Sequence, residues 1–348
     1  MPASGPDSDS VSGSRSDPVR WSAAIDRALY GPDGFYHAGP GAVGHFRTSA
    51  AAPASVREIF AGAVGELLER VDAALDRPDR MDLVDVGAGS GELLDAVHTC
   101  LGAELRTRVR PAVVERRPRP QGLLPYVRWL ADVPEMTGLL IANEWLDNVG
   151  IDVVVEDDAD GESVLLVDEA GVERPGPAPS AQESAWLARW WPTGDRREIG
   201  LHRDVAWAGA VSRMRRGLAV AIDYAHTGDN RPAYGTLTGF RAGREAEPIP
   251  DGSCDLTAHV AIDSAAAAGA ASGTAIGRAV RTLLTDQRAA LRALDVSGRR
   301  PDYAADPGGY AAALQRAGDA AELIDPAGLG AFAWLIQGID LDPAQILS

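Results

Sequence analysis

Apolar residues recur along the chain with two different periods, and the alternation of these periods predicts an α/β protein. Helical spacing predicts helices over residues 21–30, 55–75, 91–101, 182–191, 203–216, 265–271 and 276–294. Short apolar runs predict strands over 82–86, 112–115, 126–130, 139–142 and 218–223, with further strands over 235–240 and 255–262. Strands that alternate with helices favour a mostly parallel central sheet.

The same pattern divides the chain into segments. Residues 1–17 are rich in Ser, Gly, Asp and Pro, and we expect a disordered tail there. An N-terminal helical and loop cap is expected over 18–80 and the sheet core over 81–225. Two β-rich runs, 151–155 and 163–167, predict a hairpin within an insertion over about 151–202. Residues 226–348 are expected to complete the sheet and add helices.

Composition removes several classes of function. The net charge of −17 argues against nucleic-acid binding as the main task. All 33 basic residues are arginine, which excludes a Walker A lysine and a Schiff-base lysine and fits a bacterial coding bias. Cys100 and Cys254 lack ligand spacing, so we expect no metal. No secretory or membrane-spanning apolar run is present, and we expect a cytoplasmic protein without membrane insertion.

A glycine-rich turn carries the strongest chemical signal. The run Val84-Asp85-Val86-Gly87-Ala88-Gly89-Ser90-Gly91 takes a strand into a helix, and a β-carbon in this turn would block an adenosyl ligand. Glu115 ends the next predicted strand, where a carboxylate can accept hydrogen bonds from both ribose hydroxyls. We therefore expect Gly87, Ala88, Gly89, Gly91 and Glu115 to bind a cofactor.

Two cofactors fit such a turn, and Glu92 favours one of them. A nicotinamide dinucleotide site would have a small residue at this position, and a carboxylate at the helix N-terminus repels pyrophosphate. S-adenosylmethionine (SAM) carries no phosphate, so the sequence favours SAM. A tight turn without any ligand is the other alternative.

A second group of polar residues follows the fourth predicted core strand. Asn143, Glu144 and Asp147 would face the glycine turn across the carboxyl ends of the strands. There they could orient a nitrogen nucleophile and accept its proton. Asn143 as the N-cap of a helix, with Glu144 in its first turn, explains the same residues equally well.

Several motifs together resemble the MidA-type methyltransferases, relatives of the mitochondrial complex I assembly factor that methylates arginine. The matching pieces cover about residues 20–340 and begin with Tyr30-Gly31-Pro32-Asp33-Gly34-Phe35-Tyr36 and Phe46-Arg47-Thr48-Ser49. They continue with the glycine turn, Val114-Glu115, Asn143-Glu144-Trp145-Leu146-Asp147, Ile222-Asp223-Tyr224 and Asp255-Leu256-Thr257-Ala258-His259-Val260. Two departures stand out: His45 replaces the family's usual aspartate, and Val149-Gly150 replaces Leu-Pro.

The resemblance implies a Rossmann-like class I methyltransferase fold with an N-terminal cap and an inserted β-hairpin and helical segment. It implies SAM as the cofactor, with Thr48, Ser49 and Asn143 near it. It also implies catalytic roles for Asn143, Glu144, Asp147 and His259, of which His259, like Tyr224, is a weaker candidate on the substrate side.

Three functions remain open on the sequence alone. The chain could methylate an exposed arginine of a protein, with a link to respiratory complex assembly. It could methylate a small molecule, or it could be an assembly factor that keeps the fold without catalysis. The acceptor and the oligomeric state are not predicted.

Overall fold

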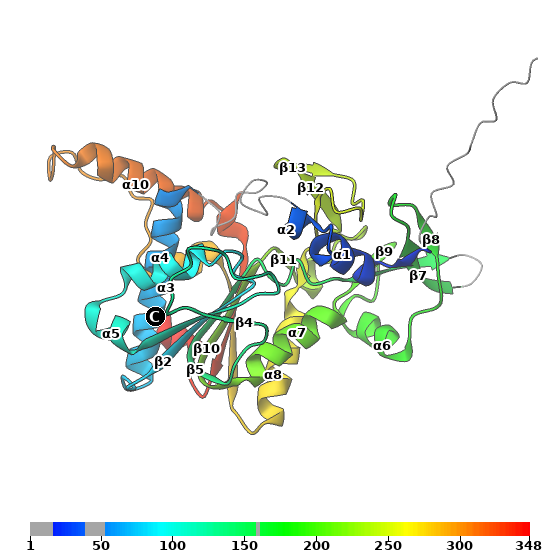
Figure 1. The fold of residues 1–348 in the computed structure, drawn as a ribbon, viewed down its shortest axis with the longest axis horizontal. Coiled ribbons are helices and arrows are strands. Elements are labelled where there is room, and N and C mark those ends of the chain that lie inside the picture. Colours follow the sequence, from blue (N-terminus) through cyan, green and yellow to red (C-terminus); the bar gives the residue numbers. More distant parts are fainter. Residues whose placement is uncertain (1–16, 39–52, 158–160) are drawn as a thin grey trace, which may run out of the picture.

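A seven-stranded sheet forms the centre of the computed structural model, which describes residues 17–38, 53–157 and 161–348 (Figure 1). The predicted disordered tail, Asp17 apart, lies outside the described residues. In spatial order the strands are β16 (Val280–Asp286), β17 (Ala333–Ile339), β10 (Met214–Asp223), β5 (Met136–Asn143), β2 (Met81–Val86), β3 (Val109–Val114) and β4 (Arg128–Leu130).

Five neighbouring strands of this sheet, from β4 to β10, run parallel. The strand β17 pairs antiparallel with both β10 and β16. The first strand in chain order, β2, lies between the second and the fourth, so the strand order reverses between β2 and β5. Ligands of open α/β sheets bind at such a reversal, beyond the carboxyl ends of the strands.

Helices cover both faces of the sheet because each strand presents alternate apolar side chains to the two sides. One face packs on α3 (Ala54–Ala74), α4 (Glu92–Cys100), α5 (Ala103–Arg108), α9 (Gln287–Ala293) and α10 (Tyr310–Leu323). The other packs on α7 (Leu201–Ser212) and α8 (Ile262–Ala275). In α3 the predicted apolar stripe, which includes Val56, Phe60, Val64 and Leu67, is buried.

A second sheet lies beside the first in Figure 1 and contains the predicted hairpin. It consists of β1 (Val19–Arg20), β6 (Asp152–Asp157), β7 (Gly161–Val167), β8 (Glu173–Pro175) and β9 (Arg196–Ile199), all paired antiparallel. The N-terminal helix α1 (Trp21–Tyr30) packs on one group of its buried side chains, and α6 (Ala181–Trp190) packs on another.

Short elements join these layers near the ends of the central strands. They are α2 (Phe35–Ala38), α11 (Pro343–Ile346), β11 (Ala225–His226), β12 (Thr238–Arg241), β13 (Arg244–Ala246), β14 (Asp255–Thr257) and β15 (Val260–Ala261), with single 3₁₀ turns at Gly228–Asn230 and Leu329–Ala331. No helix in the described ranges is both long enough and apolar enough to span a membrane.

The structure corrects three predicted elements. Residues 276–294 do not form one helix: they contain β16 and then α9, because 280–286 pairs with β17 at the sheet edge. The helix predicted over 203–216 ends at Ser212, and β10 already begins at Met214. The strand predicted over 255–262 is two short strands, β14 and β15, which pair with different partners.

Candidate functional site

The glycine turn between β2 and α4 has a backbone that suits glycine. Gly87, Gly89 and Gly91 have φ angles of 72°, 61° and 87°, in the left-handed region that other residues rarely adopt. The Gly87 N–H donates to the Val114 carbonyl at 2.9 Å and so ties the turn to β3. A β-carbon on Gly87 would lie 2.7 Å from Cδ1 of Trp145, so space as well as conformation requires glycine.

Glu115 faces this turn across the ends of β2 and β3. Its Oε2 accepts the Gly89 N–H at 3.0 Å, and its Oε1 accepts the N–H groups of Arg116 and Arg117 at 2.8 and 3.1 Å. Nη2 of Arg117 lies 3.6 Å from Oε2 of Glu115. The structure therefore brings together the glycines and the acid that the sequence predicts as one cofactor site.

The N-terminal cap reaches the same place through two aromatic side chains. The guanidinium of Arg116 lies 4.3 Å from the centre of the Tyr30 ring, and that of Arg117 lies 5.5 Å from the centre of the Tyr36 ring. The predicted cofactor residues Thr48 and Ser49, and the departure at His45, lie outside the described residues.

Asn143 is the last residue of β5, and Glu144 follows it on a strained backbone. Glu144 has a φ of 53°, unusual for a residue with a β-carbon, and its N–H donates to the Ile222 carbonyl at 2.8 Å. Nδ2 of Asn143 donates to Oε1 of Glu144 at 3.0 Å. No helix begins at Asn143 in this part of the structure, so the alternative of a helix N-cap is wrong.

A buried arginine holds the backbone around Asp147. Arg203, on α7, is 2% exposed. Its guanidinium donates to the carbonyls of Asp147, Val149, Ala258 and His259 at 2.6–2.9 Å. One side chain thus joins the loop after β5 to the loop between β14 and β15.

Burial raises the pKa of several carboxyl groups near this arginine. The pKa of Asp147 is raised by desolvation, against the lowering effects of the Thr257 hydrogen bond and the charge of Arg203. Desolvation and the charge of Asp147 raise the pKa of Asp223 well above its usual range and that of Asp255 to about 7. On β2, desolvation and then the charges of Glu115 and Glu92 raise the pKa of Asp85 to about 8.

Aromatic side chains surround these acids. The Tyr36 hydroxyl lies 2.6 Å from Oδ1 of Asn148 and 3.1 and 3.2 Å from the two carboxyl oxygens of Asp255. Tyr224 packs on His259 with ring centres 5.7 Å apart. His259 is exposed, and its ring marks the solvent side of the site.

Four buried oxygen atoms at these strand ends have no hydrogen-bond donor among the described residues. They are Oδ2 of Asp85 and Oδ1 of Asn143, Asp147 and Asp223. A buried acceptor without a donor is costly, so the site suits a ligand that brings several N–H groups. SAM carries an ammonium and a guanidinium carries five N–H groups, and both fit this requirement.

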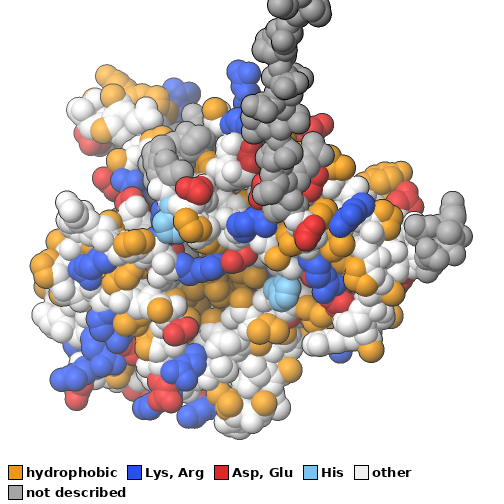
Figure 2. Space-filling view, turned by 45° about the vertical axis from the view of Figure 1, so that its right-hand side comes forward, with side chains coloured by type: hydrophobic (Ala, Val, Ile, Leu, Met, Phe, Trp, Pro, Cys, Tyr) orange, Lys and Arg blue, Asp and Glu red, His pale blue; other side chains and the backbone are white. Residues whose placement is uncertain are grey.

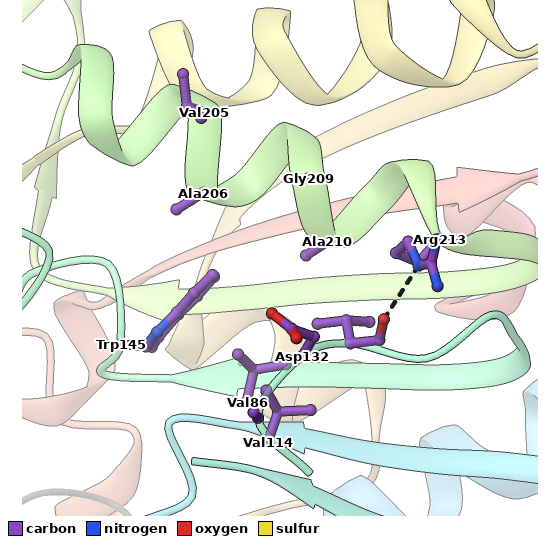
Figure 3. Close-up of a pocket in the computed structure, with 11 residues that line it drawn as sticks. Val86, Val114, Asp132, Trp145, Val205, Ala206, Gly209, Ala210 and Arg213 are labelled. Carbon is purple, nitrogen blue, oxygen red and sulfur yellow. Dashed lines mark hydrogen bonds between the residues drawn. The ribbon is translucent and has the colours of Figure 1, made fainter. Parts of the chain in front are cut away.

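A cavity of about 540 Å³ adjoins the turn on the α7 side of the sheet (Figure 3). Val86 and Val114, which directly precede Gly87 and Glu115, form part of its wall together with Trp145. Ala206 and Ala210 of α7 form another part, and Asp132 contributes a carboxylate.

Sequence reasoning missed several residues of this site. Asp85 carried a signal, since it is an acid within an otherwise apolar stretch just before the turn. Tyr36 and Asp255 stand in the motifs of the family resemblance without being predicted as site residues, and Arg203 stands in none, because long-range folding brings these three side chains to the site. Within the described ranges, no group of three or more His, Cys, Asp or Glu side chains is placed to hold a metal ion.

Two kinds of comparison relate the chain to known proteins. No protein of curated function matches the sequence. The fold is similar to a crystal structure of an uncharacterised protein from Burkholderia thailandensis, with 24% identity, a TM-score of 0.76 and coverage of 95% of this chain and 90% of that one. A second structure, of a member of the same superfamily from that organism, gives 24% identity, a TM-score of 0.74 and coverage of 93% and 89%.

The second of these proteins is described as a "likely methyl transferase" and was crystallised with S-adenosylhomocysteine. The sequence profile of the family described as "Putative S-adenosyl-L-methionine-dependent methyltransferase" matches residues 63–279, more than half of the chain. This match confirms the predicted resemblance to MidA-type methyltransferases, with SAM as the cofactor, and the two solved structures share the fold. The chain therefore belongs to this family of SAM-dependent methyltransferases.

Proposed function

We propose that the protein methylates a guanidinium nitrogen of an arginine in another protein, and that its parallel strands form a Rossmann-like class I methyltransferase core. The observation that carries the proposal is the set of buried oxygen atoms near the ends of β2, β5 and β10 that lack a donor among the described residues. Asp147 lies close enough to Asp223 for its charge to raise the pKa of Asp223, and each keeps one carboxylate oxygen without a donor there, which favours a cationic acceptor rich in N–H groups.

The cofactor fits the residues around the glycine turn. Glu115 would accept the ribose hydroxyls, and Oδ2 of Asp85 would accept an N–H of the ammonium. The purine would enter the cavity beside Val86, Val114 and Trp145. A relative whose fold is similar over most of both chains was crystallised with S-adenosylhomocysteine, which supports a cofactor of this class here.

SAM, when bound, supplies a methyl group on a positively charged sulfur. The protein must bind and align the acceptor and remove a proton from it, because a guanidinium is protonated at neutral pH. Burial raises the pKa of Asp147, which makes its carboxylate a better proton acceptor than an exposed one. Glu144, held by Asn143 at the same edge, is the second candidate for this proton transfer.

The test is methyl transfer from labelled SAM to protein extract of a deletion strain, with mass spectrometry to locate the methyl group. We expect methylarginine, and the acceptor's identity will show whether it belongs to a respiratory complex. Methylation of lysine, or of a small molecule alone, would refute the proposal.

Variants separate binding from chemistry. In Asp147→Asn and Glu144→Gln we expect S-adenosylhomocysteine binding within about threefold of wild type, and a turnover at least about 100-fold lower in one of them. Asp72→Asn is the matched control, because Asp72 is a buried aspartate paired with Arg108 at 2.7 Å, away from the site. Unchanged turnover in both site variants would remove these two acids from the mechanism.

A further inference from the structure

The connection between β4 and β5 is unusually short for two parallel strands. These strands are separated by β3 and β2 in the sheet, and residues 131–135 alone join them. Crossovers between parallel strands generally take a dozen or more residues and include a helix. Here the connector contains no helix, and the guanidinium Nε of Arg213 holds it by donating to the Val133 carbonyl at 3.1 Å.

Without a crossover helix, part of the sheet face stays uncovered. The cavity of about 540 Å³ lies there, between this connector, α7 and the ends of β2 and β3. Figure 3 shows α7 along one side of it, where the small residues Ala206, Gly209 and Ala210 line the cavity. In Figure 2 a hollow with hydrophobic side chains in its floor opens on this face of the molecule.

The cavity continues directly from the cofactor site. Val86 and Val114 in its wall are the neighbours of Gly87 and Glu115, and Trp145 contacts both places. If Glu115 binds the ribose, as proposed above, the purine extends into the cavity. A volume of this size suits a whole drug-sized ligand and exceeds what one purine ring fills.

We propose that this cavity makes the enzyme tolerant of cofactors enlarged on the purine ring. The purine amino group is on the ring farthest from the sugar, so an apolar group on that nitrogen would extend toward α7. A substituted amine keeps one N–H, which the carboxylate of Asp132 in the wall can accept. The apolar substituent would then lie against Ala206 and Ala210.

The inference rests on the proposed placement of the cofactor, and calorimetry on the full chain tests the two separately. The ligands are S-adenosylhomocysteine and its N6-benzyl derivative. We expect the Kd of the derivative to be within tenfold of that of the parent compound. A derivative that binds more than 100-fold more weakly while the parent binds normally would overturn the inference alone. Failure of both ligands would overturn the placement of the cofactor as well.

A matched pair of variants locates the substituent. A β-carbon added at Gly209 meets no atom within 4 Å, so both Gly209→Ala and Gly209→Leu should fold. We expect Gly209→Leu to weaken the benzyl derivative at least tenfold and to leave the parent compound unchanged. Gly209→Ala should change neither. Equal binding of the derivative to wild type, Gly209→Ala and Gly209→Leu would contradict the position of the benzyl group beside α7. Ala206→Phe repeats the test from the neighbouring turn of the helix.

Discussion

Replacing Asp85 by asparagine should stabilise the protein without cofactor at neutral pH, even though it removes a residue of the candidate site. Asp85 is 3% exposed and its Oδ2 has no donor within the structure described. Desolvation, with the charges of Glu115 and Glu92, raises its pKa from 3.8 to about 8. The native protein therefore binds more protons than the unfolded chain between these two values, and its stability falls as the pH rises through that window.

These two pKa values set the size of the effect. At pH 7 the shift from 3.8 to about 8 costs the native state roughly 4 kcal/mol, since each unit is worth about 1.4 kcal/mol and the unfolded group is ionised above its own pKa. The amide of asparagine would be partly unpaired, which costs about 1–3 kcal/mol. The net expectation for Asp85→Asn is a gain of about 1–3 kcal/mol at pH 7–8 and a loss of about 0.5–2.5 kcal/mol near pH 4.

Urea unfolding followed by circular dichroism at four pH values between 4.5 and 8.5 measures this difference. Asp82→Asn is the control: Asp82 is on the same strand and equally buried, but it is paired with Arg110 at 3.0 Å, so this variant should be less stable than wild type. A difference between Asp85→Asn and wild type that does not change with pH would refute the reasoning. The variant should also bind S-adenosylhomocysteine more weakly, which calorimetry detects.

Three further predictions concern other parts of the site. Gly87→Ala puts a β-carbon at a φ of 72° and in contact with Trp145, so we expect the free energy of unfolding to fall by about 1–3 kcal/mol and the Kd for S-adenosylhomocysteine to rise more than tenfold. The control is Gly62→Ala, where a β-carbon meets no atom within 4 Å, and it should change neither quantity. Arg203→Lys should lower the free energy of unfolding by about 3–5 kcal/mol. It should also speed amide hydrogen exchange in residues 146–149 and 257–260 but not in the glycine turn. An equal change of exchange in these three segments would contradict the role of Arg203 in joining the first two. Tyr36→Phe should lower the free energy of unfolding, measured with urea, by about 1 kcal/mol or more. The loss should be larger at pH 8.5 than at pH 5, because Asp255 is ionised at the higher pH and then lacks the donor. A loss independent of pH would count against this contact.

The sequence predicts those parts of the site that short-range structure determines. A glycine turn after a buried strand has few possible conformations, and Glu115 lies at the end of the adjacent parallel strand, so their proximity follows from the topology alone. The same argument places Asn143 and Glu144 at that edge. What local patterns could not show is that Asp85, Asn143, Asp147 and Asp223 would each keep an acceptor with no donor in the described part of the chain.

The errors come from segments whose conformation depends on distant partners. Residues 276–294 are rich in Ala, Leu and Arg, which favour a helix, yet 280–286 is an edge strand because β17 pairs with it along its whole length. Arg203 looks like an ordinary helix residue in the sequence, and only the folded chain puts four carbonyls around it. Tyr36 and Asp255 are 219 residues apart, beyond the reach of any local pattern.

The missing crossover helix also bears on the order in which ligands leave. The cavity beside α7 and the buried acids Asp147 and Asp223 have no residue in common among those described. If the cofactor enters through the cavity and the acceptor through a separate entrance beside these acids, spent cofactor can be exchanged for fresh cofactor while the acceptor protein stays in place. Such an enzyme can add two methyl groups to one side chain in a single encounter, so the ratio of dimethylated to monomethylated product early in the reaction reports how the two entrances are used.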